Sequence, residues 1–119
     1  MERDPLPDAG SWRAIEDRQE RLRAGLRAIY GWYERNATMA ACVLRDAEYH
    51  ALTKEIAEMR FEPLMAAYQE VLGAKLNAKQ HAVLQLALSF FTWRTLVRDG
   101  GLKPGAAVEA MVQAIDGAK

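Results

Sequence analysis

Few side chains in this sequence are spaced for chemistry, and the two histidines are the first to consider. Asp46 and His50 lie four residues apart, so a helix would place both on one face, and His81 is a conceivable third metal ligand. The competing interpretation is a solvated Asp–His pair and a histidine near a helix end. One cysteine and two histidines cannot supply a zinc-binding pattern. We therefore expect neither a metal site nor a cofactor.

Nucleophilic catalysis has no better support in the sequence. Cys42 has no local partner that would act as its base, so we interpret it as a small buried hydrophobic residue rather than a reactive thiol. The sequence contains no G-x-S-x-G or S-x-x-K pattern that would indicate a serine nucleophile. We expect that the protein is not an enzyme. A single cysteine cannot form an internal disulfide, which is consistent with a reducing cytoplasm.

Aromatic and sulfur-containing side chains form the larger group of candidates. One interpretation is that they fill a packed core, as such side chains usually do. The other is that they line a pocket for an apolar or aromatic small molecule, because methionine adapts to irregular shapes and aromatic rings offer stacking surfaces. The candidate ligand-binding residues are Trp32, Tyr33, Met39, Cys42, Met59, Phe61, Met65, Tyr68 and Phe91.

The elements that must position these side chains are all predicted to be helices. We expect a flexible arm over residues 1–10, a short turn capped by Ser11, and helices over 17–36, 38–46, 49–73, 77–100 and 104–117. Thr38 caps the second of these helices, Asn77 and Gln80 cap the fourth, and Pro104 starts the fifth. Pro63 removes a backbone donor, so the third helix should kink or break near Phe61 and help to open the pocket.

The predicted helix 77–100 is apolar over more than half of its circumference. One apolar face contains Val83, Leu86 and Phe90, and a second contains Leu84 and Leu88. A helix so apolar in a small protein is either central or in contact with a second chain. We expect a homodimer through the last two helices, with the contact residues Leu86, Phe90, Trp93, Val97, Val108, Met111, Val112 and Ile115. Arg94 interrupts the apolar face and needs a polar partner inside the protein or across the interface.

Composition narrows the possible functions further. The chain has 119 residues, of which 50% are hydrophobic and 27% charged, with 16 basic and 16 acidic side chains. Zero net charge provides no field for nucleic acid or an anionic membrane, and the longest apolar stretch, residues 82–93, is too short to cross a bilayer. We expect one all-α helical bundle of about five main helices over residues 11–117 that contacts neither nucleic acid nor membrane by itself.

Three segments together carry a family resemblance. They are residues 20–36 (ERLRAGLRAIYGWYERN), residues 43–47 (VLRDA) and residues 91–98 (FTWRTLVR) followed by Gly101 and Leu102. In this order they resemble the C-terminal regulatory domain of TetR-family transcriptional regulators. The resemblance implies that the chain binds a small-molecule effector among the first four helices and dimerises through the last two, as part of a repressor.

The resemblance also has a departure. TetR-type regulators begin with a helix-turn-helix domain, and no recognition helix precedes Asp17. DNA binding is therefore implied only for a longer parent protein. An alternative from another class is a stand-alone helical adaptor that binds a different protein and takes no ligand. An open reading frame that continues upstream of Met1 into a helix-turn-helix pattern would favour the regulator.

Overall fold

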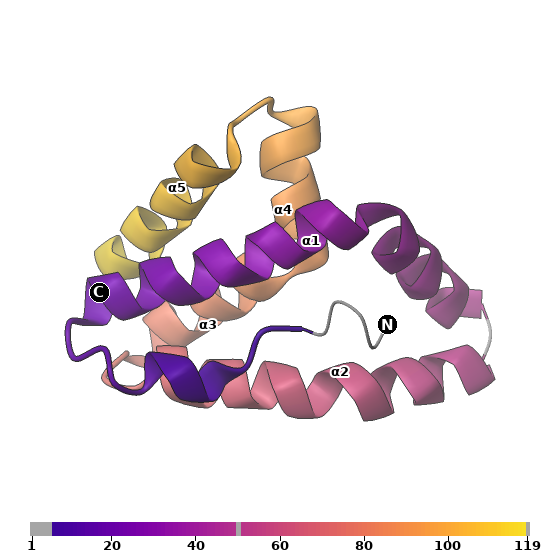
Figure 1. Ribbon diagram of the computed structural model, residues 1–119, viewed down its shortest axis with the longest axis horizontal. Helices are drawn as coiled ribbons and strands as arrows, with labels where there is room; N and C mark the ends of the chain where they lie inside the picture. Colours follow the sequence, from indigo (N-terminus) through magenta and orange to yellow (C-terminus); the bar gives the residue numbers. More distant parts are fainter. Residues whose placement is uncertain (1–5, 50, 119) are drawn as a thin grey trace.

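The computed structural model describes the backbone of residues 6–49 and 51–118, and within these ranges the chain folds as an all-α bundle (Figure 1). The prediction of an all-α fold is confirmed, and the described residues form no strand. The elements in chain order are η1 (Ala9–Trp12, a 3-10 helix), α1 (Arg18–Tyr49), α2 (Ala51–Leu72), α3 (Ala78–Leu88), α4 (Phe90–Arg94), η2 (Thr95–Asp99, a π-helix) and α5 (Pro104–Gly117). No described helix combines the length and apolarity that a membrane span requires.

Helix α1 covers the two helices predicted over 17–36 and 38–46, which meet at a kink within it. As predicted, Asp17 precedes its first turn, where the carboxylate accepts hydrogen bonds from the backbone N–H groups of Gln19 and Glu20 at 2.9 and 3.2 Å. The regular helix is interrupted at Asn36, which has a non-helical backbone (φ −121°, ψ 20°) and marks a kink between two helical segments. The Asn36 side chain donates to the Trp32 carbonyl at 3.0 Å. The predicted end of the first helix at Asn36 is therefore confirmed, and a second helical segment follows the kink and runs to Tyr49. The cap at Thr38 stays a prediction.

Helix α2 continues through Pro63, so the predicted break near Phe61 is wrong, while the kink stays a prediction. A proline removes one helical hydrogen bond, and the remaining turns on both sides hold the helix together. The side chains of residues 44, 46–51, 53, 54 and 56–61 lie outside the described part of the structure. The predicted role of this proline in opening a pocket therefore has no structural counterpart here.

The short helix η1 starts three residues earlier than the predicted turn. Asp8, rather than Ser11, is its N-cap and accepts a hydrogen bond from the Gly10 N–H. Residues of the predicted arm contact the rest of the bundle: the Tyr68 hydroxyl donates to the Pro7 carbonyl at 2.6 Å, and Leu6 packs against the core. This segment therefore lies on the bundle from Leu6 onward.

The predicted helix over 77–100 is divided into three parts. Its start is as predicted, because Asn77 and Gln80 form a reciprocal capping box. The backbone then becomes extended at Ser89 (ψ 135°), which separates α3 from α4, and the last turn widens into the π-helix η2. Of the two glycines predicted to end the helix, only Gly101 has a positive φ (73°). The last helix, α5, begins at Pro104 and ends at Gly117, as predicted.

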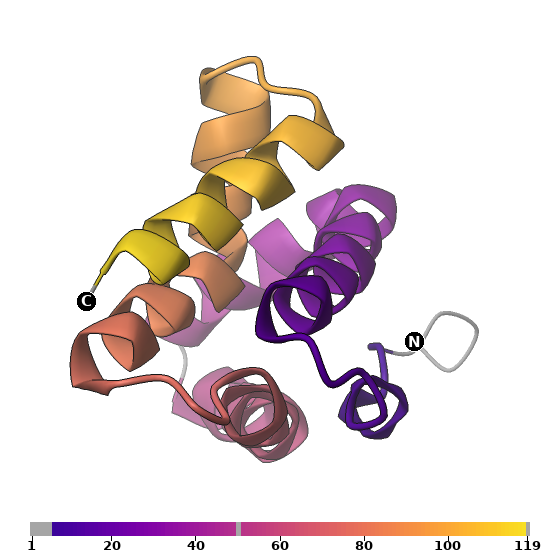
Figure 2. The same ribbon diagram turned by 90° about the vertical axis from the view of Figure 1, so that its left-hand side faces the viewer.

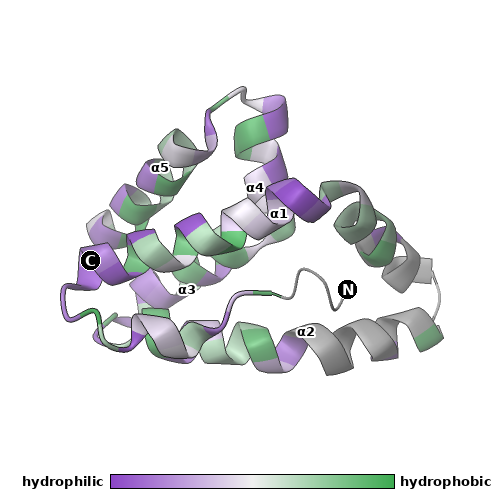
Figure 3. Cartoon of the chain, viewed as in Figure 1, coloured by the Kyte–Doolittle hydropathy of each residue, from purple (hydrophilic) through white to green (hydrophobic). Residues whose placement is uncertain are grey.

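Helix α1 lies at the centre of the bundle. It packs against α2 and η1 on one side and against α3, α4 and α5 on the other (Figure 2). Hydrophilic and hydrophobic residues alternate along α1 and α5 with helical spacing, as expected for helices with one face in the core (Figure 3). The largest fully buried side chains include Leu22, Leu26 and Ile29 of α1 together with Trp93 of α4 and Ile115 of α5.

Candidate functional site

The break between α3 and α4 is held by side-chain hydroxyls that reach three consecutive carbonyls. The Tyr30 hydroxyl donates to the Ala87 carbonyl at 2.6 Å, and the Tyr33 hydroxyl donates to the Leu88 carbonyl at 2.5 Å. Thr92 donates from Oγ1 to the Leu86 carbonyl at 2.6 Å. Carbonyls at the end of a helix have no helical partner, so the two tyrosine hydroxyls satisfy acceptors at Ala87 and Leu88 that would otherwise lack a helical donor, while Thr92 adds a second bond at the Leu86 carbonyl.

Ser89 completes the break on the other side. Its Oγ accepts a hydrogen bond from the Phe91 N–H at 3.2 Å, which caps α4, and its own N–H donates to the Leu86 carbonyl at 3.2 Å. Sequence reasoning missed this break and the role of Tyr30. One signal was present, because Ser89 is a favoured N-cap residue that interrupts the apolar stretch 82–93.

The aromatic rings around the break pack on one another. Tyr33 contacts Phe90 edge-on at a centroid distance of 5.5 Å, and Phe90 lies 5.5 Å from Trp93. Burial raises the pKa of Tyr30 and of Tyr33 above the ordinary tyrosine value, since an ionised ring would lose its hydration here. Both hydroxyls therefore stay protonated and remain hydrogen-bond donors at neutral pH.

The predicted ligand-binding residues divide into two groups. Trp32, Tyr33 and Tyr68 are buried in the core, where both tyrosine hydroxyls already bond to backbone carbonyls. Met39 and Met65 are half-buried and pack at the margin of that core. The structure thus places the three aromatic residues as core residues, the first of the two interpretations drawn from the sequence.

The remaining ligand-binding candidates lie elsewhere or cannot be placed. Cys42 is exposed on the second half of α1, so the prediction that it is buried is wrong. Phe91 has 43% of its surface exposed on α4. The side chains of Met59 and Phe61 lie outside the described residues.

Most of the predicted dimer-contact residues are covered by the chain itself. The buried members are Phe90, Trp93, Val108, Val112 and Ile115. Val97 and Met111 are partly buried against the same core. Leu86 is the exception, with 56% of its surface exposed. The apolar width of helix 77–100 therefore arises largely because this segment is central in its own bundle, and any partner must contact other side chains.

One surface of the molecule remains apolar and cationic. We use the name α3–α4 surface for four exposed residues of the segment 78–99, which are Leu86 on α3, Phe91 and Arg94 on α4, and Arg98 on η2. The Arg94 guanidinium carbon lies 4.9 Å from the centre of the Phe91 ring, and that of Arg98 lies 5.2 Å from the Trp93 ring. No described carboxylate lies within ion-pair distance of either arginine. The polar partner expected for Arg94 is thus replaced by aromatic rings.

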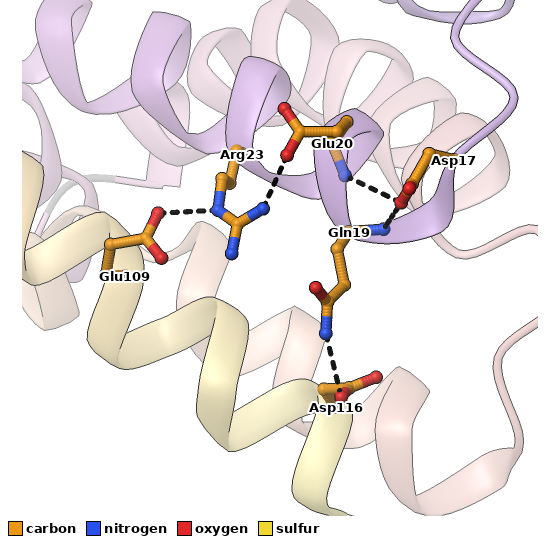
Figure 4. A network of polar contacts seen from close by, with 6 residues as sticks. All are labelled: Asp17, Gln19, Glu20, Arg23, Glu109 and Asp116. Atoms are coloured by element: carbon orange, nitrogen blue, oxygen red, sulfur yellow. Dashed lines mark hydrogen bonds and ion pairs between the residues drawn. The ribbon is translucent and has the colours of Figure 1, made fainter.

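A second polar region joins the start of α1 to α5 (Figure 4). Arg23 bonds to Glu109 at 2.7 Å and to Glu20 at 2.6 Å, while Gln19 donates to Asp116 at 2.9 Å. Arg18 forms a further ion pair with Asp116. The Glu109 carboxylate, and after it the Glu20 carboxylate, raise the pKa of Arg23 above its ordinary value, so these contacts fix a charged network.

Metal chemistry has no counterpart in the described part of the chain. No three side chains of the types that bind metals come together there. The side chain of Asp46 and all of His50 fall outside that part, so the candidate trio with His81 is not brought together by any described contact. Comparison with family models, curated proteins and solved structures gives no match for the chain.

Proposed function

We propose that this chain is the effector-binding and dimerising regulatory domain of a TetR-type transcriptional regulator. The support is the resemblance of residues 20–36, 43–47 and 91–98 together with an all-α fold that ends in the helical segments α3–α4–η2 and α5. The observation that carries dimerisation is the α3–α4 surface, because it exposes Leu86 and Phe91 on the segment to which the resemblance assigns the partner. In such a regulator a separate domain would contact DNA.

The composition of this surface suits a protein partner. Stable interfaces have an apolar centre enriched in aromatic residues and arginine, and Leu86, Phe91 and Arg94 provide this combination. A dimer built on it buries more than about 1,000 Å² if it is stable in solution. Its contact residues differ from most of those predicted from the sequence, because the buried residues of α5 cannot reach a second chain.

The dimer is tested by light scattering and sedimentation of the full chain at tens of micromolar. We expect a dimer, and Leu86→Asp and Phe91→Asp should each give a monomer with an unchanged far-UV circular dichroism spectrum. The matched control is Leu52→Asp, because Leu52 is 69% exposed on α2, outside this surface. A monomeric wild-type protein, or dimers that all three variants leave intact, would contradict the proposal.

For the effector, two of the predicted ligand-binding side chains are half-buried and so available for contact. Met39 on α1 and Met65 on α2 both pack at the margin of the core and suit an apolar or aromatic molecule. Thermal-shift measurements with a panel of planar aromatic compounds should find a stabilising ligand, with a gain of about 2.7 kcal/mol at a hundredfold excess over its dissociation constant. Met65→Ala should change the ligand preference, while Leu52→Ala should not.

A second candidate function is favoured by one observation. Trp32, Tyr33 and Tyr68 are buried, and the two tyrosine hydroxyls already donate to the protein's own carbonyls. This arrangement favours a helical protein-interaction domain that takes no ligand. A flat thermal-shift screen together with an intact dimer would select this candidate over the effector-binding domain.

A further inference from the structure

The carbonyls at the break between α3 and α4 have two alternative sets of donors. In a continuous helix the Ala87 carbonyl would accept from the Phe91 N–H and the Leu88 carbonyl from the Thr92 N–H, each four residues ahead. In the observed structure Tyr30 and Tyr33 donate to these two carbonyls instead. The Phe91 N–H is bonded to Ser89 Oγ. The tyrosines of α1 therefore replace the backbone N–H donors that the Ala87 and Leu88 carbonyls would have in a continuous helix.

Local sequence around the break contains no residue that forbids a helix. Neither proline nor glycine lies between Ala78 and Arg98, and Ser89 alone favours a helix cap over a helix interior. A helix that breaks at a serine loses backbone hydrogen bonds, and its stability falls unless other donors bond to the freed carbonyls. The broken form thus rests on the local caps by Ser89 and Thr92 together with the tertiary contacts that Tyr30 and Tyr33 of α1 provide.

The aromatic packing next to the break retains an unsatisfied group. The buried indole Nε1 of Trp93 has no protein acceptor among the described residues. A buried donor without an acceptor lowers the stability of the arrangement that contains it. The observed form therefore carries one polar cost on the α4 side, which the bonds from Tyr30 and Tyr33 offset.

We propose that residues 86–92 are a two-state hinge, which Tyr30 and Tyr33 of α1 hold broken and which becomes a continuous helix when their hydroxyls withdraw. The change re-aims α4 relative to α3, so it alters the relative placement of Leu86 and Phe91 on the α3–α4 surface. Because α1 contacts both sides of the bundle, a displacement of α1 is converted into a change of that surface. The hinge does not depend on the TetR resemblance and would operate in either candidate function.

The hinge is tested by nuclear magnetic resonance of the full labelled chain. In the double variant Tyr30→Phe, Tyr33→Phe, the Ser89 Cα chemical shift should move from its extended value toward a helical one. The amides of Phe91 and Thr92 should exchange more slowly because they gain carbonyl acceptors inside a helix. Tyr68→Phe is the matched control, since it removes another buried tyrosine hydroxyl whose acceptor, Pro7, lies outside the hinge.

Ser89→Ala provides a test that does not disturb the core. It removes the α4 cap and adds helix propensity, so it should shift the Ser89 position toward the helical state in the same direction as the double variant. An extended residue 89 in Ser89→Ala, with unchanged amide exchange at Phe91 and Thr92, would overturn the proposal, and it would do so even if the double variant did not fold. A helical shift in Tyr68→Phe equal to that in the double variant would also overturn it.

Discussion

Helix α1 contacts α5 on one side and α3 and α4 on another, and the polar contacts on these two sides are of different kinds. Toward α5, charged side chains pair near the surface, where Arg18 contacts Asp116 and Arg23 contacts Glu109. Toward α3 and α4, neutral hydroxyls of Tyr30 and Tyr33 bond to backbone carbonyls inside the core. Solvent screens the first set of interactions and is excluded from the second.

This difference indicates which contacts determine the fold of the segment 78–99. Ion pairs at a surface contribute little, because the charges lose hydration and side-chain freedom when they pair. A buried hydroxyl–carbonyl bond contributes modestly when it is made, but its loss leaves a carbonyl without water or protein donors. The tyrosine side of α1 should therefore be sensitive to substitution and the α5 side tolerant.

The largest expected loss of stability comes from the aromatic core beside the break. Trp93→Ala removes a fully buried ring that contacts Tyr33 and Phe90, so the free energy of unfolding should fall by about 3–5 kcal/mol. Urea unfolding followed by far-UV circular dichroism measures this change. Phe91→Ala, at an exposed ring on the same helix, is the control and should cost much less. Equal losses in the two variants would show that the tyrosine side has no tight core.

Alkaline pH should lower the stability through the buried tyrosine Tyr68 on α2. An unfolded tyrosine ionises near pH 10, whereas burial, and secondarily the Asp8 charge, raise the pKa of Tyr68 to about 12. The folded protein therefore holds this proton more tightly, so its stabilising contribution is complete below pH 10 and is lost as the pH rises through about 12. Urea midpoints measured across this window should fall, and Tyr68→Phe should flatten part of the fall. A flat profile would contradict the burial of this hydroxyl.

A single hydroxyl should have an intermediate effect. Tyr33→Phe keeps the ring packing but leaves the Leu88 carbonyl without its donor, so unfolding should become easier by about 1–3 kcal/mol. The same urea experiment applies, with the exposed Phe91→Ala again as the reference. A loss of unfolding free energy below a few tenths of a kcal/mol would mean that the Leu88 carbonyl has another donor, as it would if residues 86–92 become a continuous helix.

The sequence predicts a structural feature well when the residues that specify it are close together in the chain, and poorly when they are far apart. The capping box of Asn77 and Gln80 and the helix start at Pro104 were predicted, because each is specified by residues a few positions apart. The break at Ser89 was missed because its donors, Tyr30 and Tyr33, are more than fifty residues away in the chain. The hydrophobic pattern of residues 77–100 does not indicate that hydroxyl groups of another helix bond to this segment.

The candidate site shows the same limit in a different way. The sequence correctly marks Tyr33, Trp93 and Val108 as apolar positions that must be covered, yet it cannot say whether a ligand, a second chain or the same chain covers them. The bundle covers them itself. Leu86 is exposed, so its predicted contact with a partner stays a prediction, whereas Met39 and Met65 keep only partial exposure. The predicted break near Phe61 was also wrong, since flanking turns outweigh one lost bond.

The smallest expected effect lies on the α5 side of α1. Arg18→Ala breaks the ion pair with Asp116, and the stability should fall by less than about 1 kcal/mol because both side chains are partly exposed. The difference between wild type and variant should shrink further in high salt, which the urea midpoints at two ionic strengths would show. A loss as large as that of Tyr33→Phe would remove the contrast between the two sides.

The burial of the tryptophans gives the molecule an optical property. Trp12 lies 5.4 Å from Tyr68, while Trp32 and Trp93 lie 6.1 and 6.3 Å from Tyr33, measured between ring centres. Light absorbed by these tyrosines is therefore emitted by tryptophan through energy transfer, and the emission is blue-shifted because all three indoles are buried. Since Trp12 reports on η1 and α2 while Trp93 reports on α4, single-tryptophan versions of the chain would follow the two ends of the bundle separately without an added dye.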